Sequence, residues 1–274
     1  MISYPNCKIN LGLHVVRRRD DGYHDLQTVF YPVPLCDELV IVPAEKFSFS
    51  QTGIAVDCNA EDNIVVKAFR LMKLENGNRL PDVEIRLDKR IPFGAGLGGG
   101  SSDAAFTLRM LNDLFNLGMD NSRLRSLASR LGADCPFFID NEPSYATGIG
   151  DILSPLGFNP LKNHRLVVVK PDESVSTAEA YRGISPREST GLTCPDLLSL
   201  LREPVECWRN TIVNDFETTV FKGHPLLSRI KEKLYEEGAL YAAMSGSGSA
   251  VYGIFEPNAV TDLKFGSTYY SFDI

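Results

Sequence analysis

The stretch between residues 92 and 105 constrains the fold of this chain more than any other segment. Five of the seven residues 94–100 are glycine, and Ser101 and Ser102 follow directly. A dense glycine cluster marks backbone in conformations that side chains prevent, because glycine otherwise costs conformational entropy on folding. Without β-carbons the N–H groups of such a loop can close around a bulky anion, and a helix that follows adds its positive dipole end. The segment therefore predicts a polyphosphate-binding loop.

Regular elements are predicted on both sides of this loop. Apolar and polar residues alternate over 83–88, which predicts a half-buried strand. Apolar residues recur at three- and four-residue steps over 104–115, which predicts an amphipathic helix. Ser101 or Ser102 would be the N-cap of this helix, and Gly118 would end it. A flexible glycine-serine linker, the simplest alternative, would lack these flanking patterns.

Three other nucleotide-binding loops share part of the pattern. Residues 94–99 match the dinucleotide motif G-x-G-x-x-G, but Asp120 or Asn121 then begins a second helix where that motif needs a ribose-binding strand. The P-loop motif fails because Gly100 occupies the position of its lysine. The later motifs of a protein kinase are absent from the sequence. The loop is therefore of a different kind.

Composition limits the class of protein. A chain of 274 residues with 43% hydrophobic content suits one large globular unit or two packed domains. A net charge of −7 argues against a nucleic-acid-binding protein. The beginning of the chain does not resemble a signal peptide, and no apolar run approaches the ~20 residues of a membrane span. The cysteines form no C-x-x-C pair, and we expect them to be reduced and mostly buried, as in a cytoplasmic protein without a zinc site: Cys7, Cys36, Cys58, Cys135, Cys194 and Cys207.

The first strand predicted from the sequence carries polar residues in line. Apolar side chains alternate there with Lys8, Asn10 and His14, which predicts a half-exposed strand. A tight turn at Asp21-Gly22 and a second strand over 26–31 follow.

A Pro-, Gly- and Asn-rich stretch over 154–164 predicts a boundary between two domains, 1–158 and 159–274. A second glycine cluster, 245–249, is either a functional loop or a tight connection between strands. Other predicted elements are a helix that begins at Asp62 or Asn63, helices over 177–181 and 225–237, and strands over 135–139, 166–169, 240–244 and 250–255.

Together these motifs resemble the GHMP kinases, small-molecule kinases that include the galactose, homoserine and mevalonate enzymes. The resemblance covers about residues 3–255 and rests on residues 8–13, 21–28, 92–105, 132–138 and 244–248. Asp21-Gly22-Tyr23-His24 discriminates most, because other members lack it, and it points to a member with a cytidine diphosphate substrate. Cys7 departs from the alanine common before the lysine, and the segment after Phe255 cannot be aligned.

The resemblance implies an α+β fold of two domains with an active-site cleft between them. It implies transfer of the γ-phosphoryl group of ATP, with Mg²⁺, to an alcohol in non-mevalonate isoprenoid precursor biosynthesis. The implied partners are ATP and the small cytidine diphosphate substrate, with no nucleic acid, membrane or obligate protein partner. A kinase for another alcohol, a catalytically silent sensor and a simple binding module are the alternatives, and the presence of both Lys8 and Asp134 argues against the last two.

By similarity, Lys8 and Asp134 form the catalytic pair. The protein ligands of the metal stay open, because Ser102 could be a ligand or a helix cap. The implied ATP-binding residues are Pro92, Phe93, Gly94, Ala95, Gly96, Leu97, Gly98, Gly99, Gly100, Ser101 and Ser102. The implied substrate-binding residues are Asn10, Tyr23, His24, Thr177 and Tyr181.

Overall fold

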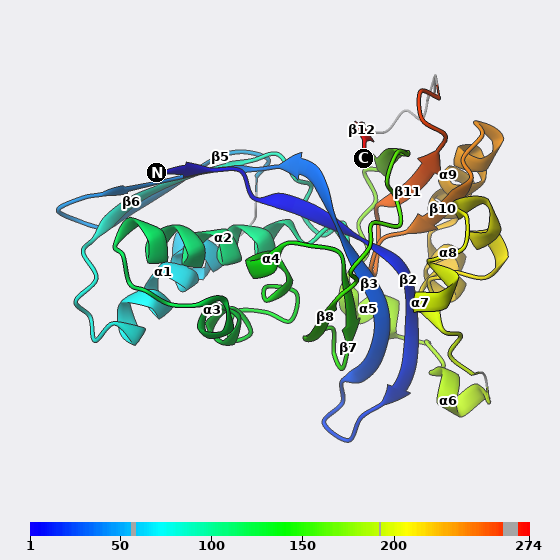
Figure 1. Ribbon diagram of the computed structural model, residues 1–274, viewed down its shortest axis with the longest axis horizontal. Coiled ribbons are helices and arrows are strands. Elements are labelled where there is room, and N and C mark those ends of the chain that lie inside the picture. Colours follow the sequence, from blue (N-terminus) through cyan, green and yellow to red (C-terminus); the bar gives the residue numbers. More distant parts are fainter. Residues whose placement is uncertain (56–58, 192, 260–267) are drawn as a thin grey trace. The chain divides into compact units, whose positions relative to one another are not determined.

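The computed structural model describes residues 1–55, 59–191, 193–259 and 268–274. The chain forms two compact units, each assembled from separate segments. Unit 1 comprises Met1–Lys8, Pro32–Phe93 and Gly98–Glu142, and unit 2 comprises Ile9–Tyr31, Gly94–Leu97 and Pro143–Ile274. Both units combine strands with helices (Figure 1), which confirms the predicted α+β class. The family-domain division into 1–158 and 159–274 stays a prediction.

Unit 1 contains a four-stranded sheet with helices. The strands in spatial order are β1 (Ile2–Ser3), β4 (Glu38–Pro43), β6 (Val83–Lys89) and β5 (Ser48–Gly53). The helical elements are η1 (Ala60–Asp62), α1 (Ile64–Glu75), α2 (Gly99–Leu114), α3 (Asn121–Ala128) and α4 (Phe137–Asp140). α2 packs against α1, α3 and α4. β6 alternates buried and exposed side chains, as predicted, and the glycine loop connects it directly to α2.

Two of the predicted helix starts in unit 1 are confirmed. The side chain of Asn63 accepts a hydrogen bond from Val65 N at the start of α1, and the side chain of Asp120 accepts one from Arg123 N at the start of α3. Each bond satisfies an N–H group that has no partner within its own helix.

Two other expectations in unit 1 are wrong. The N-cap of α2 is Gly98, with φ of +70°, so Ser101 and Ser102 lie inside the first turn and do not cap it. Glycine adopts this left-handed conformation without steric cost, which lets the helix begin at the end of the loop. The predicted strand over 135–139 is instead a turn at Cys135 and Pro136 followed by the first three residues of α4, and Pro136 already has helical φ and ψ.

Unit 2 contains a second four-stranded sheet covered by helices. Its strands in spatial order are β10 (Tyr241–Met244), β11 (Val251–Phe255), β9 (Arg165–Lys170) and β12 (Thr268–Asp273). Its helical elements are α5 (Thr177–Tyr181), α6 (Arg187–Thr190), α7 (Leu197–Leu200), η2 (Val205–Asn210), α8 (Glu217–Gly223) and α9 (Pro225–Glu236). α9 packs on β10 and β11, and its Leu227, Ile230 and Leu234 join the core of the unit.

A third sheet contains the long N-terminal hairpin. Its order is β2 (Asn6–Arg18), β3 (His24–Cys36), β7 (Ser144–Thr147) and β8 (Ile152–Pro155), and β2 and β3 contribute residues to both units. β2 is buried on both faces from Asn6 to Val15, so the expectation of a half-exposed strand is wrong.

The described cysteines are all free thiols, as expected, but only Cys7 and Cys135 among them are buried. Cys58 lies outside the described residues. Across the described ranges, no helix combines the length and the apolar character that crossing a membrane requires.

His14 is completely buried on β2 in unit 2. Neither ring nitrogen has a hydrogen-bond partner among the described residues. Burial, and then the positive charge of Arg187, lower the pKa of His14 from 6.5 to about 4, although Asp215 opposes this shift. His14 is therefore neutral in the folded protein at every pH above this lowered pKa.

We expect His14 to weaken the fold in acid. The unfolded chain takes up a proton near the ordinary pKa and the folded chain only near the lowered one, so stability is lost as the pH falls from about 6.5 to about 4. The loss reaches up to about 3 kcal/mol of unfolding free energy. Urea unfolding at a series of pH values measures it. His14→Phe should flatten the curve in this window, and an unchanged slope would assign it to other groups.

Candidate active site

The predicted catalytic pair is brought together within unit 1. Lys8 lies near the start of β2 and is only 3% exposed, and its Nζ is 3.4 Å from Oδ2 of Asp134. The side chain of Asp134 is 33% exposed and stands just ahead of α4, in a turn closed by a hydrogen bond from Cys135 N to Gly132 O. The pair thus joins a buried ammonium group to a carboxylate that reaches solvent.

The end of the glycine loop packs against Lys8 of this pair. A β-carbon at Gly98 would be 3.2 Å from Cγ and Cε of Lys8 and 3.1 Å from the ring of Phe138. A β-carbon at Gly132 would be 4.0 Å from the hydroxyl oxygen of Ser101. The first turn of α2, Lys8 and the turn that carries Asp134 therefore lie side by side. Ser102 N donates to Gly98 O at 2.9 Å, whereas the N–H groups that precede it at the start of an α-helix have no partner within the helix.

Ser102 is buried in the first turn of α2. Its hydroxyl oxygen has no hydrogen-bond partner within the described part of the chain. A buried hydroxyl group without a partner costs free energy, so such an atom in a native fold needs an explanation. Since Gly98 is the N-cap, capping does not provide one.

The first half of the glycine loop is held by the second glycine cluster, within unit 2. The hydroxyl of Ser245 donates to Gly96 O at 2.9 Å, and Ala250 N donates to Ala95 O at 3.1 Å. A β-carbon at Gly96 would overlap the backbone carbonyl of Ser245. The cluster at 245–249 connects two strands and also supports the first half of the glycine loop by direct contact.

Two of the predicted substrate-binding residues form a stacked pair in unit 2. The rings of His24 and Tyr181 are 4.8 Å apart with an interplanar angle of 26°, and Tyr181 also meets Phe216 edge-on. Burial, and then Arg18, lower the pKa of His24, which favours the neutral imidazole. Tyr23 precedes this pair and is 61% exposed.

A hollow of about 850 Å³ opens beside the stacked rings. Its lining includes Arg17, Arg18, His24, Tyr181 and Arg182. Three arginines against one glutamate, Glu188, and two rings in this lining suit an anionic ligand that carries an aromatic base.

The other two predicted substrate residues also lie in unit 2. The Asn10 side chain donates to Thr28 Oγ1 at 2.9 Å, and its backbone carbonyl accepts from the hydroxyl of Tyr252 at 2.7 Å. The Thr177 hydroxyl is 3.5 Å from that of Ser247, in the second glycine cluster. A β-carbon at Gly246 would be 3.4 Å from Asn10 Oδ1, so Asn10 and Thr177 both approach the second glycine cluster. Lys8 and Asp134 thus form one group within unit 1, and His24 and Tyr181 form another within unit 2.

Comparison with known proteins identifies the family. Residues 63–142 match "GHMP kinases N terminal domain", and residues 196–264 match "GHMP kinases C terminal".

This chain belongs to the GHMP kinase family.

Its relatives are similar over nearly their whole length. A protein of Parabacteroides distasonis named 4-diphosphocytidyl-2-C-methyl-D-erythritol kinase is 51% identical over 93% of this chain and 92% of its own. A Bacteroides fragilis protein of the same name is 49% identical over 98% of this chain and 97% of its own. A crystal structure of 4-(cytidine 5'-diphospho)-2C-methyl-D-erythritol kinase superposes with a TM-score of 0.84 at 33% identity, covering 99% of this chain and 98% of that one.

The fold is shared more widely. Mevalonate kinase of Methanococcus jannaschii superposes with a TM-score of 0.73 at 12% identity, covering 99% of this chain and 97% of that one. By its family and its relatives of about 50% identity, this GHMP kinase is a small-molecule phosphotransferase, and ATP is the phosphoryl donor of its family. Among the described residues, no group of three or more His, Cys, Asp or Glu side chains could hold a metal ion.

Proposed function

We propose that this GHMP kinase transfers the γ-phosphoryl group of ATP to the 2-hydroxyl of 4-diphosphocytidyl-2-C-methyl-D-erythritol. The products are the 2-phosphate and ADP, and the step belongs to non-mevalonate isoprenoid precursor biosynthesis. The Lys8–Asp134 pair carries the proposal, because Lys8 contacts Gly98 at the end of the glycine loop and pairs there with a carboxylate that reaches solvent. The names of relatives about 50% identical support the choice of substrate.

Residues 92–102 would bind the phosphates of ATP. Phosphoryl transfer passes through a loose transition state, so its catalysis depends on positioning and on neutralising charge. The N–H groups of the loop and of the first turn of α2 would supply donors, and the dipole of this 16-residue helix would add positive potential.

Asp134 and Lys8 would act on the acceptor alcohol. The Asp134 carboxylate reaches solvent and can accept the hydroxyl proton as the oxygen attacks phosphorus. The Lys8 ammonium would stabilise the negative charge that develops on the transferred group. Its burial strengthens this interaction, because little water screens it.

Magnesium would arrive bound to ATP and would neutralise phosphate charge. The available side chains suit an ion held mainly by phosphates and water, because no three His, Cys, Asp or Glu side chains among the described residues are grouped so that they could hold it. Ser102 is the side chain that we propose to hold it. Its buried hydroxyl oxygen, which has no hydrogen-bond partner among the described residues, would be a ligand of the ion.

The cytidine end of the substrate would bind beside His24 and Tyr181. Tyr23 would stack on the base, neutral His24 would hydrogen-bond its edge, and Tyr181 would support the other side. Thr177 would contact the same end, and Asn10 would contact the methylerythritol portion.

The cytoplasmic location and the independence of a protein partner also remain predictions.

We expect Tyr23→Ala to raise the KM for the cytidine substrate. Loss of one stacking ring costs ~1–3 kcal/mol, so the increase should be at least about fivefold. The KM for ATP should stay unchanged. Steady-state kinetics with each substrate varied in turn measures both values. Tyr23→Phe keeps the ring and is the matched control, and an unchanged KM in Tyr23→Ala would place the base elsewhere.

A coupled ATPase assay tests the proposed function directly. The cytidine diphosphate substrate is compared with homoserine and mevalonate at equal concentration. Turnover of the first alone supports the proposal. Turnover of another alcohol would make the chain a different kinase of this family, and ATP binding without turnover of any would favour a sensor or binding module.

A further inference from the structure

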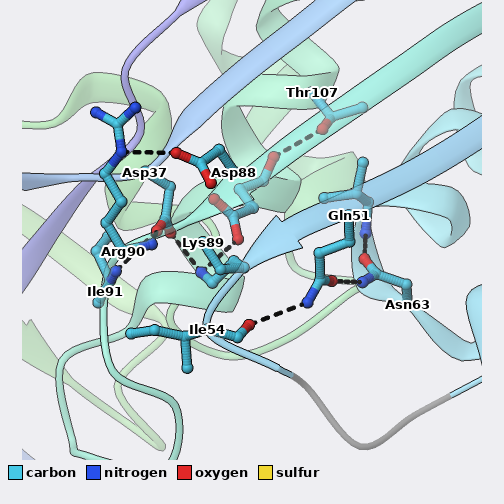
Figure 2. Close-up of polar contacts among 11 residues, drawn as sticks. Asp37, Gln51, Ile54, Asn63, Asp88, Lys89, Arg90, Ile91 and Thr107 are labelled. Carbon is cyan, nitrogen blue, oxygen red and sulfur yellow. Dashed lines mark hydrogen bonds and ion pairs between the residues drawn. The ribbon is translucent and has the colours of Figure 1, made fainter.

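A second buried ammonium group in unit 1, that of Lys89, lies between two buried carboxylates and takes no part in the Lys8–Asp134 pair. Lys89 is the last residue of β6, and its side chain is 4% exposed. Its Nζ donates to Asp37 Oδ2 and, at 2.8 Å, to Asp103 Oδ2. The carboxylates are 0% and 2% exposed. Figure 2 shows the Lys89 nitrogen beside the Asp37 carboxylate at the end of the strand.

Asp37 fixes the backbone just before the glycine loop. Its second oxygen, Oδ1, accepts from Arg90 N at 2.5 Å and from Ile91 N at 2.8 Å (Figure 2). Together with the bond from Lys89, this one carboxylate holds three successive residues. The next residue is Pro92, where the predicted ATP-binding segment begins.

Asp103 binds the same ammonium group from the other end of the loop. It lies in α2, and 14 positions separate it from Lys89 in the sequence. Gly99, the first residue of α2, packs against Ile91 and Lys89. A β-carbon at Gly99 would be 2.8 Å from Cγ2 of Ile91 and 3.3 Å from Nζ of Lys89. The strand before the loop and the helix after it are therefore tied together directly.

The cluster of Lys89, Asp37 and Asp103 contributes little net stability to the fold for the charge that it buries. Burying charges costs several kcal/mol per ion, and apolar replacements of buried ion pairs are often as stable. Asp103 Oδ1 has no hydrogen-bond partner within the described ranges, and burial raises the pKa of Asp103 well above its ordinary value. Burial opposes the charge of Lys89, yet its two carboxylate partners raise its pKa overall. The arrangement therefore needs a reason other than stability.

We propose that Lys89, Asp37 and Asp103 are positioning residues that set the affinity for ATP by fixing the distance between the two ends of the glycine loop. This inference rests on the proposed role of the loop in binding ATP. Loop N–H groups bind phosphate oxygens well only when their geometry is fixed beforehand, since otherwise binding must also order the loop.

Asp103→Ala is the variant that tests this. It removes the link to α2 and leaves Lys89 and Asp37 as a charge-balanced pair, so we expect a folded protein. Its Kd for a fluorescent ATP analogue should rise about tenfold, because small displacements of a binding group have large effects. The KM for the cytidine substrate should change less than twofold by this account. Urea unfolding measures stability separately.

Two controls separate positioning from general damage. Asp103→Asn keeps an oxygen that can accept from Lys89, and it should restore ATP affinity to within about threefold of the wild type. Lys73→Met removes an ion pair with Asp82 just ahead of the opposite end of β6, and it should leave the Kd for ATP unchanged.

Wild-type ATP affinity in folded Asp103→Ala would overturn the inference. The inference would also be overturned if the Kd for ATP and the KM for the cytidine substrate rose by equal factors, in proportion to the loss of unfolding free energy in each variant. If Asp103→Ala does not fold, Lys89→Arg decides, because it keeps the charge but forces a larger head group between the carboxylates. An unchanged Kd in Lys89→Arg contradicts the inference. Absence of turnover by the wild type would contradict the proposed function, whereas the ATP-binding comparison would remain valid.

Discussion

Asp134→Asn is expected to remain folded, to bind ATP and to lose most of its turnover. The amide keeps the size of the carboxylate but cannot take the proton of the attacking hydroxyl. A general base contributes typically about 10²–10⁴-fold, and kcat should fall by this factor. Because Asp134 lies 3.4 Å from buried Lys8, the variant also leaves that ammonium without this carboxylate. We therefore expect the decrease in kcat to lie nearer the 10⁴-fold end of this range.

Three measurements separate the loss of the base from other damage. Single-turnover kinetics reports the chemical step, a fluorescent ATP analogue reports nucleotide affinity, and urea unfolding reports stability. Asp140→Asn is the matched control, since Asp140 lies on α4 in the same unit and pairs with Arg125 at 2.6 Å. It should keep wild-type turnover. Wild-type turnover in Asp134→Asn would remove the assignment of the base.

Local patterns predict much of this fold. Amphipathic spacing identifies α1, α2 and α3, and short-range capping fixes Asn63 and Asp120, because each side chain bonds to its own helix. The glycine loop is found for the same reason, since its composition alone restricts its backbone. Lys8 and Asp134 are predicted from a family resemblance, and the structure brings them together.

Long-range contacts explain what the sequence does not predict. β12 pairs with β9, which precedes it by about 100 residues, and no local pattern selects that partner. The Lys89 cluster joins Asp37 to Asp103 across two elements, and each residue alone resembles an ordinary surface charge in the sequence. Hydroxyl–carbonyl contacts such as that of Ser245 with Gly96 leave no signal beyond the presence of a second glycine cluster.

That last contact leads to the second large effect, which we expect from Gly96→Ala. Gly96 has φ of +74°, and a β-carbon there would overlap the carbonyl oxygen of Ser245. Two backbone segments must then separate, which also breaks the hydrogen bond from Ser245 Oγ to Gly96 O. A displacement of about 1 Å can cost on the order of 10²-fold, and we expect a loss of this size in kcat/KM for ATP.

Gly94→Ala is the control that isolates the contact from backbone strain. Gly94 has φ of +62°, in the same left-handed region, but no atom lies within 4 Å of a β-carbon built there. Both variants share a strain of roughly 1–2 kcal/mol, whereas Gly96→Ala alone meets Ser245. Its kcat/KM for ATP should therefore fall at least about tenfold below that of Gly94→Ala. Equal losses would mean that strain, and not the support from the second glycine cluster, determines how well the loop binds ATP.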